Sequence, residues 1–288
     1  MKTLSEDTSP TVERMQLAIV GRMPAWRKLE LIAGMNMLLT SAVMQGIEAR
    51  QPGVDAHARR LRLDEVRLGL GLARTLDWLR RDRPDILSGE DIGHMADNPV
   101  GLAPIAVIAA LEGLGIPYYV GGSIASGVHG MYRATADMDI VADMREDQVA
   151  PFVRLLPDTL YADDHMIRDA IRHRSSFNVL DSESGFKVDV FISKGRPFEQ
   201  SQFERRNAVP LTALGERTIY VSGAEGTVLA KLEWYRKGGE VSDRQWTDIL
   251  SILKVKVVDI DLAYLRHWAP VIGVADLLER ALDDAGLQ

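Results

Sequence analysis

Two aspartates on one predicted strand have the spacing that metal chemistry needs. Asp137 and Asp139 flank Met138 in a run that continues as Ile-Val-Ala. Side chains on a strand alternate between its two faces, so both aspartates emerge together while Met138 points into the core. Their Cα atoms are about 7 Å apart at the usual strand rise, and two carboxylates at that separation suit shared hard divalent cations.

A third acid, Asp189, has the same setting in the predicted strand 186–192, where a valine precedes and follows it. On a strand beside the first, it would complete a site for one or two Mg²⁺ ions. The plainer interpretations are a solvated strand end or turn caps for Asp137 and Asp139, and an exposed hairpin position for Asp189.

A glycine–serine turn supplies the complementary part. Gly122 and Ser123 follow the predicted strand 117–120 and open a short helix. Free backbone N–H groups and the positive end of a helix dipole favour a phosphate there, and the Ser123 hydroxyl can donate one more hydrogen bond. A metal site and a phosphate cradle together suit attack on a nucleoside triphosphate. Ser123 could also simply cap the helix, which uses the same N–H groups.

These parts together resemble the nucleotidyltransferase superfamily with the polymerase-beta-type fold. The spacing carries the resemblance: Gly122-Ser123 is followed by thirteen residues, then by Asp137-Met-Asp139, and later by Val-Asp189-Val. Three independent parts therefore fit one chemistry.

Further segments extend the resemblance. Arg133-Ala-Thr, just ahead of the aspartates, is typical of one branch of the superfamily. Downstream, the runs that begin at Lys231 and at Ser242, the second reaching Asp248, are similar to bacterial AbiEii-like and related uncharacterised nucleotidyltransferases. The similar region covers about residues 100–255.

The resemblance implies a Mg²⁺-dependent enzyme that moves a nucleoside monophosphate from a nucleoside triphosphate, ATP among them, to a hydroxyl acceptor and releases pyrophosphate. It assigns catalysis and metal binding, with two Mg²⁺ ions or Mn²⁺ as the cofactor, to Asp137, Asp139 and Asp189. It assigns nucleotide binding to Gly122, Ser123, Arg133, Lys231 and Asp248. Asp189 would also act as the base on the acceptor hydroxyl.

The acceptor stays open between a protein, a tRNA and a small molecule. A toxin or phage-defence component with an antitoxin-like protein partner is consistent with the resemblance. The alternative function is a nucleotide- or metal-binding regulatory module without turnover. It would bind the triphosphate without releasing pyrophosphate.

Several of these residues also have purely structural interpretations. A lone lysine on a helix, such as Lys231, usually faces solvent. Asp248 lies four residues after Arg244, so the two could form a surface ion pair. Arg133 could orient a phosphate, brace Asp137 or form a structural salt bridge.

The order of predicted elements indicates an α+β fold with α/β-like features. We expect a nucleotidyltransferase-type mixed sheet with flanking helices, preceded by an all-α N-terminal domain and followed by a helical tail. The predicted domains are residues 1–86 and residues 87–288. The second has a core at about 100–221 and C-terminal helices at about 222–288.

Composition excludes several other classes of protein. The 288 residues are 46% hydrophobic and 26% charged, and they contain no cysteine, which excludes disulfide frameworks and thiolate-ligated metals. The net charge of −7 hides an asymmetry, because residues 1–86 hold 14 basic and 11 acidic side chains, which favours a separate unit. Neither a secretory signal nor a membrane span is expected, so the predicted location is the cytoplasm.

Overall fold

The chain divides into two compact units, each built from separate stretches of sequence. The computed structural model describes residues 2–5, 8–66, 73, 77, 102–135, 137–182, 185–211 and 217–287. Unit 1 consists of Met1–Leu31, Tyr119–Arg133 and Lys194–Gln288, and unit 2 consists of Ile32–Tyr118 and Ala134–Ser193. The predicted domain boundary near residue 86 lies outside the described residues.

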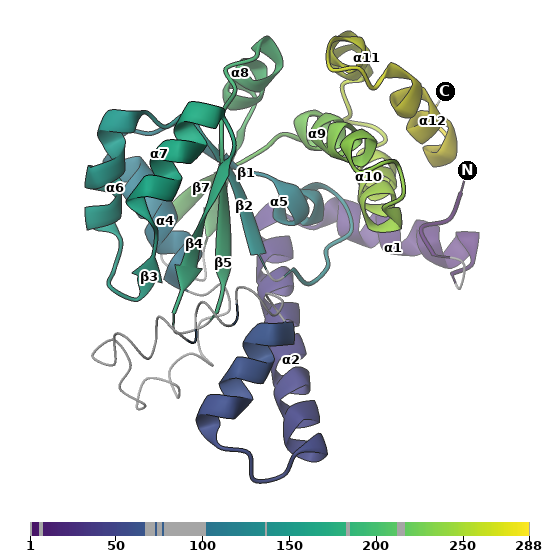
Figure 1. The fold of residues 1–288 in the computed structure, drawn as a ribbon. Helices are drawn as coiled ribbons and strands as arrows, with labels where there is room; N and C mark the ends of the chain where they lie inside the picture. The colour runs from purple at the N-terminus through teal and green to yellow at the C-terminus, as the bar shows by residue number, and fades with distance from the viewer. Residues whose placement is uncertain are drawn as a thin grey trace. The chain divides into compact units, whose positions relative to one another are not determined.

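Unit 2 contains four strands of a mixed sheet (Figure 1). They are β2 (Asp137–Ala142), β3 (Leu160–Tyr161), β4 (Ser176–Asp181) and β5 (Lys187–Ile192). Their order is β3-β4-β5-β2, with β2 and β5 parallel and the other neighbouring pairs antiparallel. The consecutive strands β4 and β5 pair antiparallel, and Gly185, which precedes β5, adopts a φ of 67°, which favours glycine.

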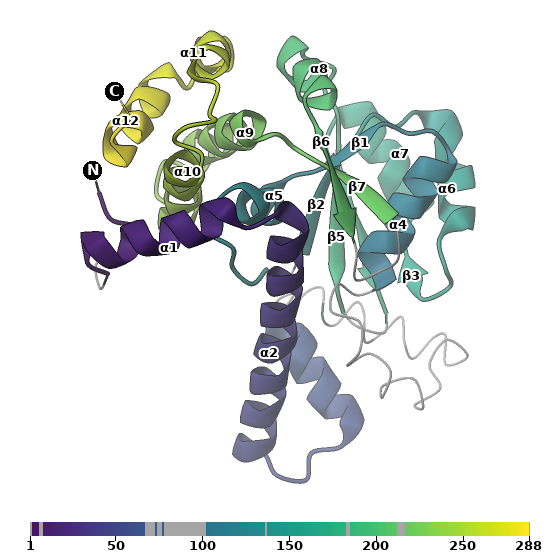
Figure 2. The ribbon, with the colours of Figure 1, turned by 180° about the vertical axis from the view of Figure 1, so that it is seen from behind.

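Helices cover one face of these four strands. Figures 1 and 2 show on the same side α4 (Leu102–Gly113), α6 (Val149–Leu155) and α7 (Asp164–His173). The β2 and β5 side chains buried on the apolar face are Met138, Ile140, Ala142, Val188, Val190 and Ile192. Because side chains alternate along a strand, the intervening residues of β2 and β5 share the opposite face.

Unit 1 contains three further strands and a short helix. They are β1 (Tyr118–Val120), β6 (Asn207–Leu211), β7 (Arg217–Val221) and α5 (Gly122–His129). β1 pairs parallel with β7 through Val120 and Val221, and β6 pairs antiparallel with β7. These strands are therefore also part of a mixed sheet.

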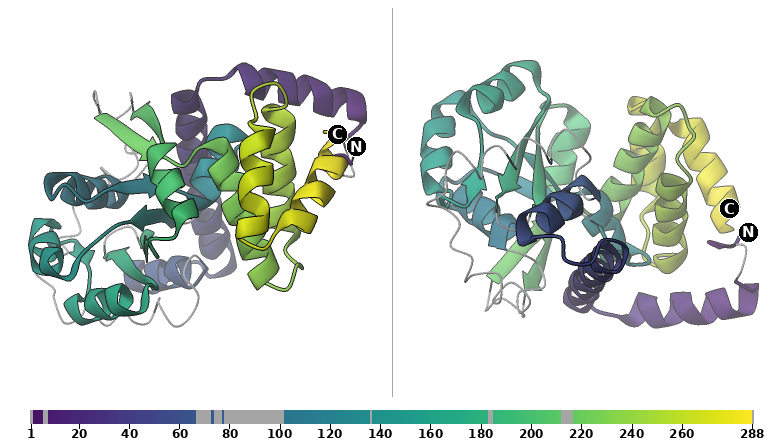
Figure 3. Two further views of the ribbon diagram at one scale, coloured as in Figure 1. Left: turned by 90° about the horizontal axis from the view of Figure 1, so that it is seen from above. Right: turned by 60° about the horizontal axis from the view of Figure 1, so that its bottom comes forward.

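The C-terminal helices supply the apolar core of unit 1. They are α9 (Ala224–Lys237), α10 (Asp243–Val255), α11 (Leu262–Val271) and α12 (Ala275–Ala285), preceded by α8 (Pro197–Glu204). Figure 3 shows α9 to α12 gathered side by side. Their shared core includes Val228, Leu229, Ile252, Leu253 and Leu278, all almost fully buried.

A buried ion pair ties the first helix to this core. In α1 (Pro10–Arg22), which contacts α10, Glu13 Oε1 lies 2.7 Å from Lys254 Nζ, and both side chains are only 2% exposed. Glu13 Oε1 also accepts a hydrogen bond from the backbone N–H of Leu4, and Lys254 donates to the carbonyl of Lys2. The N-terminal segment is thereby part of unit 1.

The predicted fold class is confirmed, since mixed-sheet strands are flanked by helices and followed by a helical tail. Helices also precede them: α1, α2 (Ala25–Arg50) and a helix over residues 56–66. Among the described residues, no helix combines the length and the apolar character that crossing a membrane requires.

Removing one partner of the buried Glu13–Lys254 pair should destabilise unit 1. Lys254→Met leaves the Glu13 carboxylate buried without its counter-charge, and we expect unfolding in urea to show a loss of about 3–5 kcal/mol. The double variant Glu13→Leu/Lys254→Met should recover most of it. Lys194→Met, at an exposed lysine, is the matched control. A loss of under about 1 kcal/mol in Lys254→Met would contradict the structural role of the pair.

Candidate active site

The sheet of unit 2 places the three predicted acids on one face. In the parallel pairing of β2 with β5, Asp139 is the direct partner of Asp189, and Asp137 is the partner of Lys187. Asp137 and Asp139 alternate with the buried Met138, so both lie on the face that Asp189 shares. The predicted juxtaposition on neighbouring strands is therefore present.

The environment of Asp189 reflects this crowding. Burial raises the pKa of its carboxyl group, and the charge of Asp137 adds to the rise, while Lys187 opposes it. On its other side Asp189 is the antiparallel partner of Asn178 in β4, which adds a polar side chain to the same face. The site thus holds more oxygen donors than the three predicted acids.

Lys187 is a member of this face that the sequence interpretation missed. Its Nζ lies 2.6 Å from Asp189 Oδ2. The signal was available, because a residue two positions before Asp189 on the same strand must share its face.

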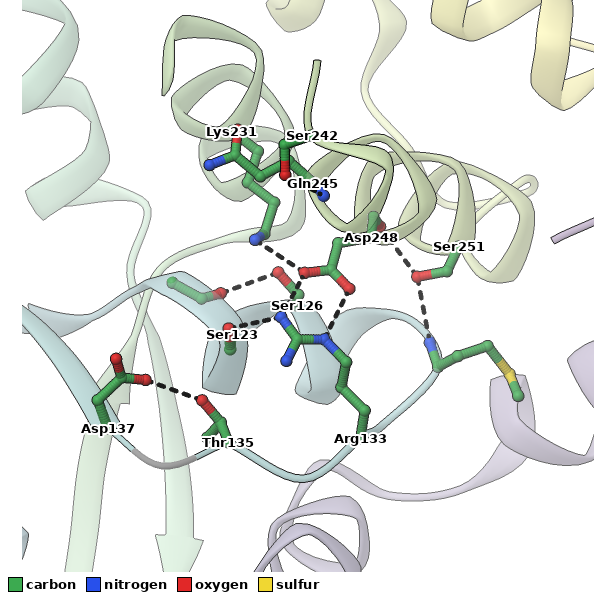
Figure 4. A network of polar contacts seen from close by, with 12 residues as sticks. Ser123, Ser126, Arg133, Thr135, Asp137, Lys231, Ser242, Gln245, Asp248 and Ser251 are labelled. Atoms are coloured by element: carbon green, nitrogen blue, oxygen red, sulfur yellow. Dashed lines mark hydrogen bonds and ion pairs between the residues drawn. The ribbon is translucent and has the colours of Figure 1, made fainter. Parts of the chain in front are cut away.

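Asp137 is held by the segment that precedes β2. The Thr135 hydroxyl donates a hydrogen bond of 2.9 Å to Asp137 Oδ1 (Figure 4). The backbone N–H of Thr135 in turn donates to Asn36 Oδ1 of α2 at 2.8 Å. These contacts fix the direction in which the Asp137 carboxylate leaves the strand.

The donor set suits a hard divalent cation, since carboxylate oxygens are the ligands that Mg²⁺ and Mn²⁺ prefer. In the arrangement observed, however, one oxygen of Asp189 is already paired with Lys187. Over the part of the chain that the structure describes, no group of three or more acidic or histidine side chains stands ready to bind a metal ion.

The predicted helix after the glycine–serine turn is present in unit 1 as α5. Gly122 begins α5 with a φ of 54°, a conformation that favours glycine. The N-cap residue, Gly121, provides no side-chain hydrogen bond to the first turn. Within the described residues, the first-turn N–H groups, including that of Ser123, thus lack a side-chain cap from the N-cap position at the positive end of the helix.

The remaining predicted nucleotide-binding residues form one network within unit 1. Asp248 of α10, which is buried, accepts from Arg133 at 3.0 and 3.2 Å and from Lys231 of α9 at 2.9 Å (Figure 4). Arg133 also donates to Ser123 Oγ at 2.7 Å. Lys231 is buried rather than solvent-facing, and Arg244 is exposed. Four predicted residues are thus brought together, with Asp248 as the counter-charge of two cations.

The C-terminal end of α5 is held by buried polar contacts. Lys28 of α2 is 2% exposed and donates to the carbonyl of Val128 at 3.0 Å. His129 Nε2 lies 2.6 Å from the carbonyl of Ser222. A Cβ atom on Gly130 would approach Ser251 Oγ to 2.4 Å, so glycine is required where the chain leaves α5 beside α10.

These buried groups titrate far from their ordinary values. Burial lowers the pKa of His129 to about 4, with the charges of Lys256 and Lys28 adding to the effect and the Ser222 carbonyl opposing it. Burial also lowers the pKa of Lys28 to about 8, again with Lys256 contributing. His129 is therefore neutral at pH 7 and donates its Nε2–H to the carbonyl.

Comparison with known proteins finds remote likenesses among solved structures. No model of a known protein family matches the chain, and no curated protein matches it. Among solved structures, an antigenic nucleotidyltransferase-like protein from Paracoccidioides brasiliensis is 15% identical, with a TM-score of 0.38 over 60% of this chain and 90% of that one. JHP933 from Helicobacter pylori is 15% identical, with a TM-score of 0.35 over 70% of this chain and 91% of that one.

A more distant likeness is to a STING-associated CdnE c-di-GMP synthase from Capnocytophaga granulosa. It is 12% identical, with a TM-score of 0.19 over 72% of this chain and 71% of that one. The site residues, and not these likenesses, carry the function proposed below.

Neutralising Asp248 should destabilise the network. In Asp248→Asn, Arg133 and Lys231 lose a shared counter-charge in a buried place, and we expect a loss of about 2–4 kcal/mol in the free energy of unfolding, measured in urea. Asp259→Asn, at an exposed aspartate, should change it by no more than about 0.5 kcal/mol. Equal stability of the two variants would show that Asp248 is not the counter-charge of both cations.

His129 should make the protein acid-sensitive. Its pKa is about 4 in the folded state against about 6.5 when unfolded, so the unfolded state binds the extra proton first as pH falls. Stability should therefore decline from pH 6.5 towards pH 4, by on the order of 2 kcal/mol from this group. In His129→Gln the decline should shrink by that amount. His267→Gln, at an exposed histidine, should leave it unchanged.

Proposed function

We propose that this protein is a Mg²⁺-dependent nucleotidyltransferase that transfers a nucleoside monophosphate from a nucleoside triphosphate to a hydroxyl group. The observation that carries the proposal is the register of β2 with β5. It pairs Asp139 with Asp189 and keeps Asp137 on the same face. Three carboxylates so gathered, one of them with a raised pKa, fit cation-assisted chemistry on an anionic substrate.

Asp137, Asp139 and Asp189 are the residues that would hold the divalent cations. When bound, Mg²⁺ offsets the charge of the triphosphate and makes the acceptor hydroxyl easier to deprotonate. Thr135 orients Asp137 through its hydroxyl. Asp189, the most buried of the three acids, would accept the proton of the acceptor hydroxyl.

The phosphates would lie at the start of α5. The first-turn N–H groups at Gly122 and Ser123 suit the β- and γ-phosphates, and the Ser123 hydroxyl can donate as well. Lys231 and Arg133 bring positive charge, held in place by Asp248. A triphosphate that binds there would add its own negative charge beside these two cations.

The proposal requires the acids and the phosphate cradle to act on one substrate. Three residues, Ala134, Thr135 and Ala136, lie between Arg133 and Asp137 in the chain, so the two sets of residues are close in sequence.

The transfer is an in-line displacement. The acceptor oxygen attacks the α-phosphorus while its proton passes to a carboxylate oxygen of Asp189. The bond from the α-phosphorus to the bridging oxygen breaks, and pyrophosphate leaves with the cations of the cradle as counter-charges. The acceptor in this proposal is a hydroxyl of a protein, a tRNA or a small molecule. Action as a toxin or phage-defence component with an antitoxin-like partner is the wider form of the proposal.

Removing the carboxylate charges should abolish transfer without unfolding the protein. The full-length protein is incubated with Mg²⁺, each α-³²P-labelled triphosphate and a cell extract as the source of acceptor. We expect wild type to label an acceptor and release pyrophosphate. Asp137→Asn and Asp139→Asn should each lose at least about 10²-fold in rate, because charge stabilisation of this kind is usually worth that much. Asp147→Asn, at an exposed aspartate of unit 2, should keep full activity.

Two results would contradict the proposal. If the two site variants label as well as wild type does, the acids are not catalytic. If the wild-type protein binds triphosphate and Mg²⁺ in calorimetry yet releases no pyrophosphate with any extract, a regulatory module without turnover is favoured instead.

A further inference from the structure

A lysine stands among the carboxylates that the proposed function assigns to metal. Lys187 is the register partner of Asp137 and lies two residues before Asp189 on β5. Its Nζ is 2.6 Å from Asp189 Oδ2. One ammonium group is therefore placed on the face where three acids gather.

The pair is sheltered from water. The Lys187 side chain is 21% exposed and that of Asp189 is 12% exposed. An ion pair at this depth is screened less by water and salt than one at the surface. The three acids carry a formal charge of −3 together, and Lys187 reduces it to −2. It thus supplies part of the charge compensation that a cation would otherwise provide.

We propose that Lys187 is a built-in counter-cation that competes with the divalent metal ion for Asp189. The inference rests on the proposed function, since it takes Asp137, Asp139 and Asp189 as the metal site. Lys187 is a positioning residue, because it acts through Asp189 and not on the substrate.

The competition follows from distance. A Mg²⁺ ion bound to Asp189 Oδ2 would lie about 2.0–2.1 Å from that oxygen. The ammonium nitrogen already lies 2.6 Å from the same atom. Two cations so close to one oxygen repel each other strongly, so Lys187 must turn away when a metal ion binds there. It stabilises the acids in the metal-free protein and weakens their affinity for the metal.

The first test measures metal binding directly, without nucleotide or turnover. Free Mn²⁺ is followed by electron paramagnetic resonance in titrations of the full-length wild type, Lys187→Met, Lys187→Gln and Lys187→Arg. We expect the two neutral variants to bind Mn²⁺ about tenfold more tightly than wild type does. Lys187→Arg keeps the charge and should bind as wild type does. Lys194→Met, at an exposed lysine, is the matched control and should also be unchanged.

The second test separates competition from a merely structural role. Melting temperatures are compared in metal-free buffer and in millimolar Mn²⁺. Lys187→Met and Lys187→Gln should melt below wild type without metal, because the partly buried Asp189 then loses its ion-pair partner. Mn²⁺ should raise their melting temperatures more than it raises that of wild type, since tighter binding stabilises more. A structural role alone would lower the melting temperature equally with and without Mn²⁺.

The outcomes distinguish this inference from the proposed function. If wild type binds Mn²⁺ but the neutral variants bind it equally or more weakly, the competition is refuted and the proposed function stands. If neither wild type nor any Lys187 variant binds Mn²⁺, both the inference on Lys187 and the proposed function are refuted. If Asp139→Asn in the Lys187→Met background still binds Mn²⁺ as tightly, the bound ion lies elsewhere and both fail as well.

Discussion

The register of two parallel strands is the constraint on which the candidate site depends. β2 and β5 pair so that Asp139 faces Asp189, while Met138 and Val188 enter the core together. A slip of one residue on either strand would move its acids into the apolar core and its apolar side chains out. The apolar face beneath α4 and α7 therefore fixes where the carboxylates lie. Packing energy on one face holds like charges together on the other.

Each unit balances part of the charge that it gathers. On the sheet face of unit 2 the acids have Lys187, and in unit 1 the cations Arg133 and Lys231 share Asp248. Partly buried charges without such partners would be costly, so the internal ion pairs let a folded protein keep them before any ligand arrives. A charged ligand must then exchange partners with these pairs. The affinity for such a ligand therefore depends on the difference in free energy between the ion pairs that it forms and the internal ion pairs that it breaks.

The sequence predicts well the features that repeat within one strand or turn. Alternation of period two located β2 and β5 and the side of β2 on which its acids lie. Elements without such a pattern were not predicted. One is β6, which contains Pro210, and a proline argues against a strand except at the edge of a sheet. β6 is the last strand in the sheet order and so lies at an edge. In α1 the buried positions include Glu13, a charged residue that no hydrophobic periodicity would place inside. Its partner is 241 residues away, so only the tertiary structure shows it.

The difference between local sequence patterns and contacts of residues far apart in the chain also explains which parts of the site could be predicted. Asp248 and Arg244 are spaced for a local pair on one helix, a pattern that sequence reasoning weighs readily. The structure instead pairs Asp248 with Arg133 and Lys231, which are 115 and 17 residues away. Burial of Asp248 favours the distant partners over Arg244. A buried carboxylate is costly unless cations lie beside it inside the protein, whereas an exposed carboxylate can pair with a neighbour on its helix or with water. The position of Lys187 could be predicted from the sequence only in part. Its face was fixed by its spacing from Asp189, and only the pairing of the strands showed how many acids share that face with it.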